Sequence, residues 1–167
     1  MAPNLLTCVS DTSPLNYLIL IGADQILPRL FHNVLIAPSI LEELSHAKTP
    51  YAVRNWIANR PAWIEIATAK PIPNQILLSL HAGERDAITI AVESHRTLLI
   101  DERDGSEIAR RLGVKTVGTL GLLDVAAERG WLDLRAAFDR LRATSFRAPI
   151  AVMAALLRKH NSRHRKH

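Results

Sequence analysis

Short apolar runs alternate with amphipathic stretches along the whole chain, and glycine and proline residues separate them. Runs such as 34–36 and 97–100 are typical of buried strands, whereas the broad apolar face of 83–94 indicates a helix packed on a sheet. Strands joined through helices need right-handed crossovers, which favours parallel pairing. The pattern therefore predicts an α/β protein with a parallel sheet.

Turn and cap signals set the boundaries of these elements. Ser13 is expected to cap a helix with Pro14 at its first position, and Gly22, Gly113 and Gly130 are expected to end helices. Residues 70–74, with two prolines, indicate a surface loop. The predicted strands are 5–9, 34–36, 63–66, 97–100 and 114–117, and the predicted helices are 13–22, 25–31, 38–44, 51–59, 83–94, 106–113, 119–130, 134–142 and 149–159.

Composition restricts the class of protein further. With 167 residues, 48% hydrophobic and 22% charged, the chain has the size and balance of one globular domain. No apolar run is long enough to span a bilayer, and residues 1–9 lack the basic start of a secretory signal, so we expect a cytoplasmic protein. The single cysteine, Cys8, excludes an internal disulfide and argues against a thiolate zinc site.

The net charge of +5 is concentrated at the C-terminus. Residues 158–167 hold five of the 21 Lys and Arg residues and none of the 16 Asp and Glu residues, so the remaining chain is neutral. We therefore predict one domain, 1–157, followed by a basic tail, 158–167. Such a tail, including Arg158 and Lys159, either binds nucleic acid by releasing counterions from phosphates or is a solvated terminus, and both interpretations stay open.

Acidic residues follow the predicted strands and begin the predicted helices. In an open parallel sheet, side chains at the carboxyl ends of strands meet at one edge, where ligands bind. Each acid also has a structural explanation, because Asp and Glu residues cap helices and complement the helix dipole. The neighbouring Glu42 and Glu43 point about 100° apart, so at most one faces a site. The candidates are Asp11, Glu42, Glu43, Glu84, Asp86, Asp101, Glu102 and Asp104.

Acids gathered without basic partners would repel one another unless a divalent cation lay between them. Carboxylate ligands suit Mg²⁺ or Mn²⁺, whereas zinc prefers His or Cys, and His32, His46, His81 and His95 show no H-x-x-x-H spacing. A metal held in this way activates water and stabilises charge on a phosphate, which makes hydrolysis of nucleic acid the leading chemistry. No P-loop, dinucleotide-binding, nucleophile-elbow or C-x-x-C motif is present.

Five segments in this order resemble the PIN-domain family, and within it the VapC-like toxin ribonucleases and their uncharacterised relatives. They are V-S-D-T-S-P-L at 9–15, A-P-S-I-L-E-E-L at 37–44, G-E-R-D-A-I-T-I-A at 83–91, L-L-I-D-E at 98–102 and G-T-L-G-L-L at 118–123. The resemblance implies a three-layer α/β/α sandwich with a central parallel sheet. It also implies a Mg²⁺- or Mn²⁺-dependent ribonuclease, often a homodimer and often neutralised by a small antitoxin protein.

The resemblance also assigns roles to individual residues. Asp11, Glu43, Asp86 and Asp101 match the family's metal-binding and catalytic acids, and Ser13 matches a supporting hydroxyl. Relatives often carry a second Asp and then an Arg after the fourth strand, where this chain has Asp101-Glu102 and Gly105-Ser106. Asp104 is therefore a rival for the fourth acid, and Arg103 or Arg110 could replace the missing Arg in RNA binding. Further supporting candidates are Glu84, Glu102 and Thr119.

Two other functions compete with the ribonuclease. The altered fourth acid is compatible with a catalytically weak or inactive module that binds RNA or a protein partner. An Asp at the end of a parallel strand also suits a phosphoacceptor domain of the receiver type. Such domains usually have a lysine at the carboxyl end of another strand, whereas Lys115 lies at the beginning of one.

Overall fold

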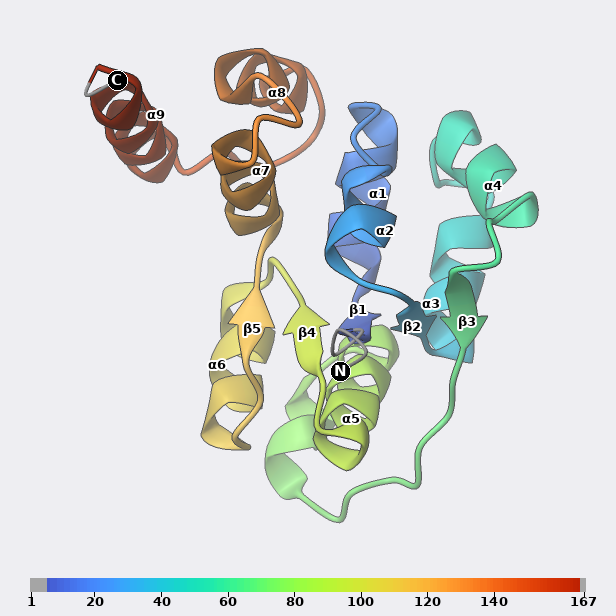
Figure 1. The fold of residues 1–167 in the computed structure, drawn as a ribbon. Helices are drawn as coiled ribbons and strands as arrows, with labels where there is room; N and C mark the ends of the chain where they lie inside the picture. The colour runs from blue at the N-terminus through green and yellow to red at the C-terminus, as the bar shows by residue number, and fades with distance from the viewer. Residues whose placement is uncertain (1–5, 166–167) are drawn as a thin grey trace, which may run out of the picture. The chain divides into compact units, whose positions relative to one another are not determined.

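The computed structural model describes residues 6–165, and Figure 1 shows the order of their helices and strands. The chain forms two compact units, Met1–Thr119 and Leu120–His167. The first contains a five-stranded, all-parallel sheet flanked by helices, as predicted. Among residues 6–165 no helix is long and apolar enough to cross a membrane.

The strand order of the sheet is β3-β2-β1-β4-β5. The chain therefore builds outward from β1 through β2 to β3 on one side, and then returns to place β4 and β5 on the other side. Val9 pairs with Leu35 of β2 and with Leu98 of β4. The point where the order reverses lies between β1 and β4, and the crevice beyond the carboxyl ends of such strands is where open α/β sheets bind ligands. The strands are β1 (Cys8–Ser10), β2 (Val34–Ile36), β3 (Ile64–Ile66), β4 (Thr97–Leu99) and β5 (Thr116–Val117).

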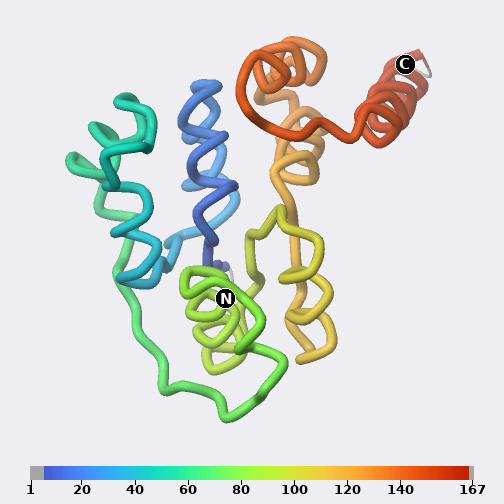
Figure 2. The backbone as a smooth tube through the Cα atoms, turned by 180° about the vertical axis from the view of Figure 1, so that it is seen from behind, coloured from blue at the N-terminus to red at the C-terminus, as the bar shows by residue number. Residues whose placement is uncertain are grey.

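Helices connect these strands and cover the sheet. In Figure 2, α5 lies in front of the strands, in agreement with its contacts to β1 and β4. The helix α3 packs against α5 and α4, and α6 packs against α5 and β5. The helices of this unit are α1 (Thr12–Leu20), α2 (Ile26–Leu30), α3 (Pro38–Ser45), α4 (Tyr51–Ala58), the short 3₁₀ helix η1 (Gln75–Ser79), α5 (Ala82–Ser94) and α6 (Arg103–Arg111).

The core of the first unit is aliphatic. Strands β1 and β4 are almost entirely buried, because a parallel sheet covered on both faces needs apolar residues at successive positions. Cys8 is fully buried there, and burial raises the pKa of its thiol far above the ordinary value. Large side chains from α1, α3 and α5, such as Leu18, Ile40 and Ile88, complete the core.

Several element boundaries differ from the sequence prediction. The helix α1 starts at Thr12 with Asp11 at the cap position, so Ser13 is not the cap. The helix α6 starts at Arg103 rather than at 106, because the Glu102 side chain accepts a hydrogen bond from the Gly105 N–H and so caps the earlier turn. The helix η1 was not predicted. Residue 5, the predicted start of the first strand, lies outside the described residues.

The second unit contains most of α7 (Thr119–Glu128), together with α8 (Leu134–Arg142) and α9 (Ile150–His164). Phe138 and Leu141 of α8 and Met153 of α9 are buried, and α8 packs against α9. The helix α9 continues five residues past the predicted end at 159, so residues 158–164 of the predicted tail are helical. Residues 166–167 lie outside the described part of the chain. The domain boundary at 157 stays a prediction.

Candidate active site

Asp11 lies immediately beyond β1, at the reversal point of the sheet. Its backbone N–H donates to the Leu99 carbonyl at 2.9 Å, which fixes it beside β4. Although Asp11 occupies the cap position of α1, its side chain makes no capping hydrogen bond, and only 5% of the residue is exposed. Capping therefore does not explain this buried carboxylate.

Asp101 follows β4 and is held by hydrogen bonds from two other segments. The Ser13 hydroxyl donates to Asp101 Oδ2 at 2.7 Å, and the Thr119 hydroxyl donates to the same atom at 2.7 Å. The Thr119 backbone N–H donates to Oδ1, also at 2.7 Å. Each carboxylate oxygen has two lone pairs, so Oδ1 retains one that these bonds do not use. Ser13 and Thr119 thus orient Asp101 and leave it able to bind another group.

Glu43 comes from α3 and closely approaches α5. The Thr12 hydroxyl donates a hydrogen bond to Glu43 Oε2. A Cβ atom at Gly83 would lie 2.5 Å from Glu43 Oε1 and 2.9 Å from Ile40 Cδ1, so any other residue there would displace these side chains from the helix contact. Glu43 is exposed, in contrast to Asp11.

Glu84, in the first turn of α5, lies close to the start of α6. A Cβ atom at Gly105 would lie 3.8 Å from Glu84 Oε2 and 3.5 Å from Glu102 Oε2, so both carboxylates border the same small space. Gly118 plays a similar part beside Asp101, whose Oδ1 would be 3.1 Å from a Cβ atom there. Three glycines, Gly83, Gly105 and Gly118, thus adjoin carboxylates of the site.

The charges of these acids act on one another. The pKa of Asp11 is raised to about 7 in total, mainly by burial and to a smaller extent by the charges of Glu84, Glu43 and Asp101, against a lowering by the Thr12 backbone N–H. The pKa of Glu84 is also raised, first by burial and then by the charge of Glu102. We call Asp11, Glu43, Glu84 and Asp101 the acidic cluster. Perturbed carboxylates at the ligand-binding edge of a sheet are typical of functional sites.

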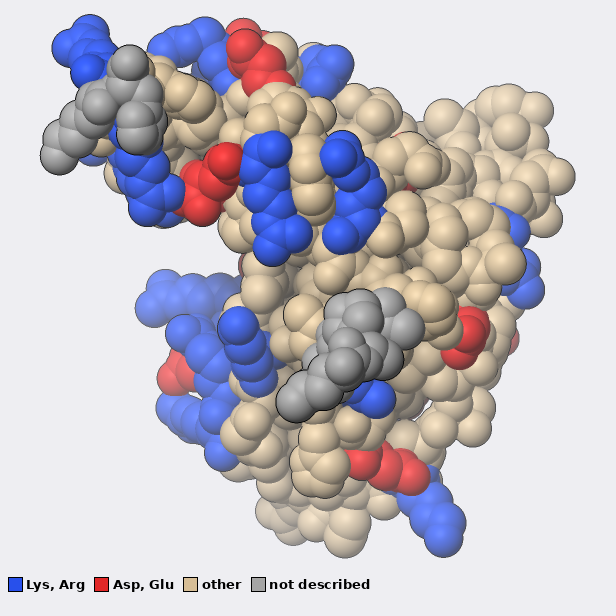
Figure 3. All heavy atoms as spheres, in the orientation of Figure 1, with Lys and Arg blue, Asp and Glu red and all other residues tan. Residues whose placement is uncertain are grey.

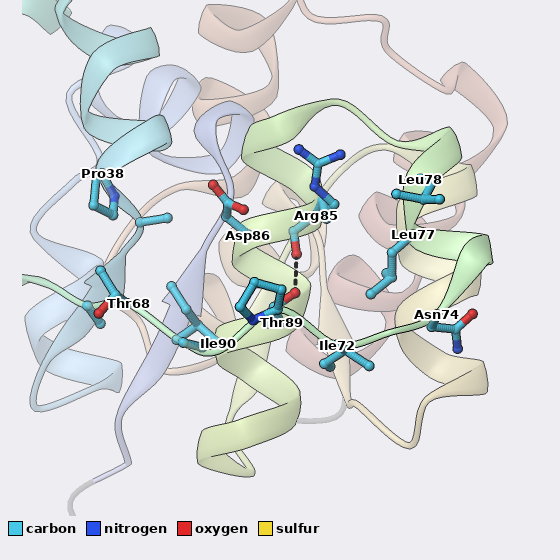
Figure 4. Close-up of a pocket in the computed structure, with 14 residues that line it drawn as sticks. Pro38, Thr68, Ile72, Asn74, Leu77, Leu78, Arg85, Asp86, Thr89 and Ile90 are labelled. Carbon is cyan, nitrogen blue, oxygen red and sulfur yellow. Dashed lines mark hydrogen bonds between the residues drawn. The ribbon is translucent and has the colours of Figure 1, made fainter.

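Asp86 lies on α5, in the helix that the sequence predicted for it. Its Oδ2 accepts a hydrogen bond from the Ser39 hydroxyl of α3 at 2.6 Å. It also lines a mostly apolar pocket of about 410 Å³, together with residues such as Pro38, Leu77 and Ile90. Figure 4 shows Asp86 and Arg85 on α5 beside this pocket. Metal binding by Asp86 stays a prediction, while Glu84 contributes the largest charge effect on Asp11.

The remaining candidates fall into two groups. Arg103, Asp104 and Arg110 are exposed on α6, and Figure 3 shows basic side chains gathered over that helix. In the second unit, the Lys159 ammonium lies 2.9 Å from Asp124 Oδ2 and 3.1 Å from Glu128 Oε1. Lys159 therefore contributes to the packing of its own unit.

The donor atoms of the acidic cluster are all carboxylate oxygens, which are the ligands that Mg²⁺ and Mn²⁺ prefer. The unused lone pair on Asp101 Oδ1 agrees with such an ion. Within residues 6–165, however, no three His, Cys, Asp or Glu side chains are close enough to hold one ion as they stand. The site fits a metal by chemistry and charge rather than by preformed coordination.

Sequence reasoning did not find all the residues that build this site. Thr12 and Ser39, which donate to Glu43 and Asp86, were not singled out, because a hydroxyl in a helix has no distinctive pattern. Thr12 at least stands between two predicted site residues. Gly83 belongs to a quoted motif, but its role as a spacer for Glu43 becomes visible only once α3 and α5 are in contact.

Comparisons with known proteins agree with this fold. The family model for the PIN domain (DUF3368) matches residues 7–162. A solved structure, a PilT N-terminus domain protein from the hyperthermophilic archaeon Sulfolobus solfataricus, is similar with a TM-score of 0.52 and 19% sequence identity, over 74% of this chain and 95% of that one. No relative was found among curated proteins.

The family match confirms the resemblance that the sequence motifs indicated, and the structural match confirms the α/β/α fold. PIN domains are generally nucleases and typically use divalent metals, so the coarse expectation is a hydrolase that binds nucleic acid. Because the match extends over nearly the whole chain, the protein belongs to the PIN-domain family.

Proposed function

We propose that the protein is an endoribonuclease that hydrolyses RNA phosphodiesters with Mg²⁺ or Mn²⁺ held by the acidic cluster. The observation that carries this proposal is the buried Asp11 carboxyl, whose pKa is about 7 beside three further acids. A protein that needed these acids only for stability would leave Asp11 with a capping bond or a basic partner. A cation at this place offsets the repulsion and favours the ionised form.

The side chains of the site have separate tasks in this reaction. Asp11, Glu43, Glu84 and Asp101 would hold the ion, and Ser13 and Thr119 would keep Asp101 oriented. When bound, the ion would activate a water molecule for attack on the phosphate and stabilise the charge that develops there.

Because its pKa is raised to about 7, Asp11 without a cation holds its proton to far higher pH than an ordinary carboxyl group. Binding of the ion would displace this proton, so we expect metal affinity to rise with pH. Arg103, which starts α6 next to Glu102, is the proposed contact for an RNA phosphate. Arg110, about two turns further along the same helix, is a second proposed contact.

We also propose a biological setting, which rests on the likeness of the sequence motifs to VapC-like toxins. The protein would be the toxin of a cytoplasmic toxin-antitoxin pair, would act as a homodimer, and would be neutralised by a small antitoxin. Expression with and without the product of an adjacent short reading frame tests the pairing. Growth arrest that this product does not relieve would argue against an antitoxin from that gene.

The direct test is cleavage of a mixed RNA pool by purified protein with Mn²⁺ or with EDTA. We expect cleavage only with metal, and a loss of at least about 100-fold in Asp11→Asn and Glu84→Gln. Asp139→Asn, an exposed residue of α8, is the matched control and should cleave normally. The RNA cleavage of Asp86→Asn shows whether Asp86, the ligand that the sequence motif suggests, is needed in addition to Glu84. Full activity of folded Asp11→Asn would refute the proposal.

A second candidate is a non-catalytic module that binds RNA. It is favoured by the finding that no three acids among residues 6–165 are placed to coordinate one ion. This candidate predicts that RNA is retained without cleavage, that Asp11→Asn binds normally, and that deletion of residues 158–167 weakens binding. Metal-dependent cleavage that Asp11→Asn abolishes would exclude it.

A further inference from the structure

Two histidines lie one turn apart near the end of α9. His160 and His164 have the H-x-x-x-H spacing that places side chains on the same helix face. Their Nε2 atoms are 3.0 Å apart, whereas their ring centroids are 4.4 Å apart. The two rings therefore converge at their Nε2 ends, where imidazole carries either a proton or a lone pair.

Two arrangements satisfy this distance. One imidazole can donate its Nε2–H to the other, or both can direct Nε2 lone pairs at one cation. With metal–nitrogen bonds of about 2.05 Å, a separation of 3.0 Å corresponds to an angle of about 94° at the metal. A tetrahedral ion would require a separation of about 3.35 Å. The geometry thus matches neighbouring positions of a square-planar or octahedral ion, which is the preference of Cu²⁺ and Ni²⁺.

The neighbouring charges permit a cation here. Lys159 and Arg163 flank the histidines in sequence, but Lys159 is paired with Asp124, and both basic side chains contact Glu128 of α7. Two positive charges next to the pair are therefore offset by two carboxylates of the same unit. His164 is exposed, so water can complete the coordination of a bound ion.

We propose that His160 and His164 form a binding site for a divalent transition-metal ion, Cu²⁺ or Ni²⁺, bound through both Nε2 atoms. This site is separate from the acidic cluster in residues and in ligand type, nitrogen instead of oxygen. An ion that bridges the two side chains would also hold the last turn of α9 in helical form, as other pairs at this spacing do more weakly.

The test is a titration of the full-length protein with Cu²⁺, followed by electron paramagnetic resonance. We expect one site whose spectrum shows coupling to imidazole nitrogen. His160→Ala and His164→Ala should each weaken it about tenfold or more, because each leaves a single ligand. His95→Asn, which removes an exposed imidazole at the end of α5, is the matched control and should bind as the parent does.

Two results would overturn the proposal. Parental affinity in both single variants would show that the histidines are a hydrogen-bonded pair only. A spectrum without nitrogen coupling would assign the copper to oxygen ligands. As an independent readout, Ni²⁺ should slow hydrogen exchange of the amides at 160–165 in the parent and not in His164→Ala.

Discussion

Replacing Asp11 by Asn should stabilise the folded protein at neutral and higher pH. The folded protein raises the pKa of this carboxyl from its ordinary value of 3.8 to about 7. Each unit corresponds to about 1.4 kcal/mol, so ionised Asp11 costs the folded state about 4 kcal/mol at pH 8. Asparagine keeps the shape of the side chain and an oxygen for the Thr12 N–H, but it carries no charge to be desolvated.

The pH profile of stability gives the sign of the effect. Below about pH 4 both the folded and the unfolded chain hold the proton on Asp11, so parent and variant should have similar stability. Between about pH 4 and pH 7 the unfolded chain has released that proton and the folded chain retains it. The parent therefore loses stability relative to Asp11→Asn as pH rises through this window, and the full difference is present above pH 7.

The assay is urea denaturation at several pH values between 4 and 8.5, read from Trp56 and Trp63 in a Trp131→Phe background. Both tryptophans belong to the first unit, so the signal reports the unit that contains the site. Asp104→Asn, an exposed acid of α6, is the control and should change stability by no more than about 1 kcal/mol. The reasoning would be refuted if the difference in the free energy of unfolding between the parent and Asp11→Asn were the same at every pH.

Three further variants test the packing around the site and in the second unit. Gly83→Ala should destabilise the first unit by up to about 2 kcal/mol in urea denaturation, because its Cβ would lie 2.9 Å from Cδ1 of the fully buried Ile40, and the better helix propensity of alanine offsets part of this cost. Phe138→Ala should cost about 3–5 kcal/mol, since the ring is fully buried in α8, and thermal unfolding would show it. Asp133→Ala should cost about 1 kcal/mol by the same measurement, because its carboxylate accepts from the Ala136 N–H at 2.8 Å.

The sequence predicted the sheet and the two acids at its reversal point for the same reason. Buried parallel strands are continuous apolar runs, and the first acidic residue after such a run marks the edge where ligands bind. Asp11 and Asp101 could be chosen in this way from the chain alone. Their partners Ser13 and Thr119 could not be derived from periodicity, and Ser13 entered only through the family resemblance.

The acids on helices were harder to choose. Glu84 and Asp86 both lie in the first turns of α5, and their directions differ by about 200° around the helix axis. Which of them faces Asp11 depends on how α5 rotates against α3, and that depends on tertiary contacts such as the one at Gly83. The start of α6 was placed three residues too late, because the cap that Glu102 provides to the Gly105 N–H leaves no mark in the apolar periodicity. Gly105 itself makes room for the Ile100 side chain.

Two basic residues of α9, Lys159 and Arg163, form ion pairs with Asp124 and Glu128 of α7. These ion pairs change how the C-terminal segment responds to ionic strength. Of the five basic residues in 158–167, two are already neutralised by carboxylates of the same unit. A single-stranded nucleic acid bound along this segment would thus exchange at most three condensed counterions, which corresponds to a slope of about −2 in log K against log salt concentration, instead of about −3.5 for five. Added salt would also loosen α9 from α7, so the same ions that weaken nucleic-acid binding would free the two paired basic groups.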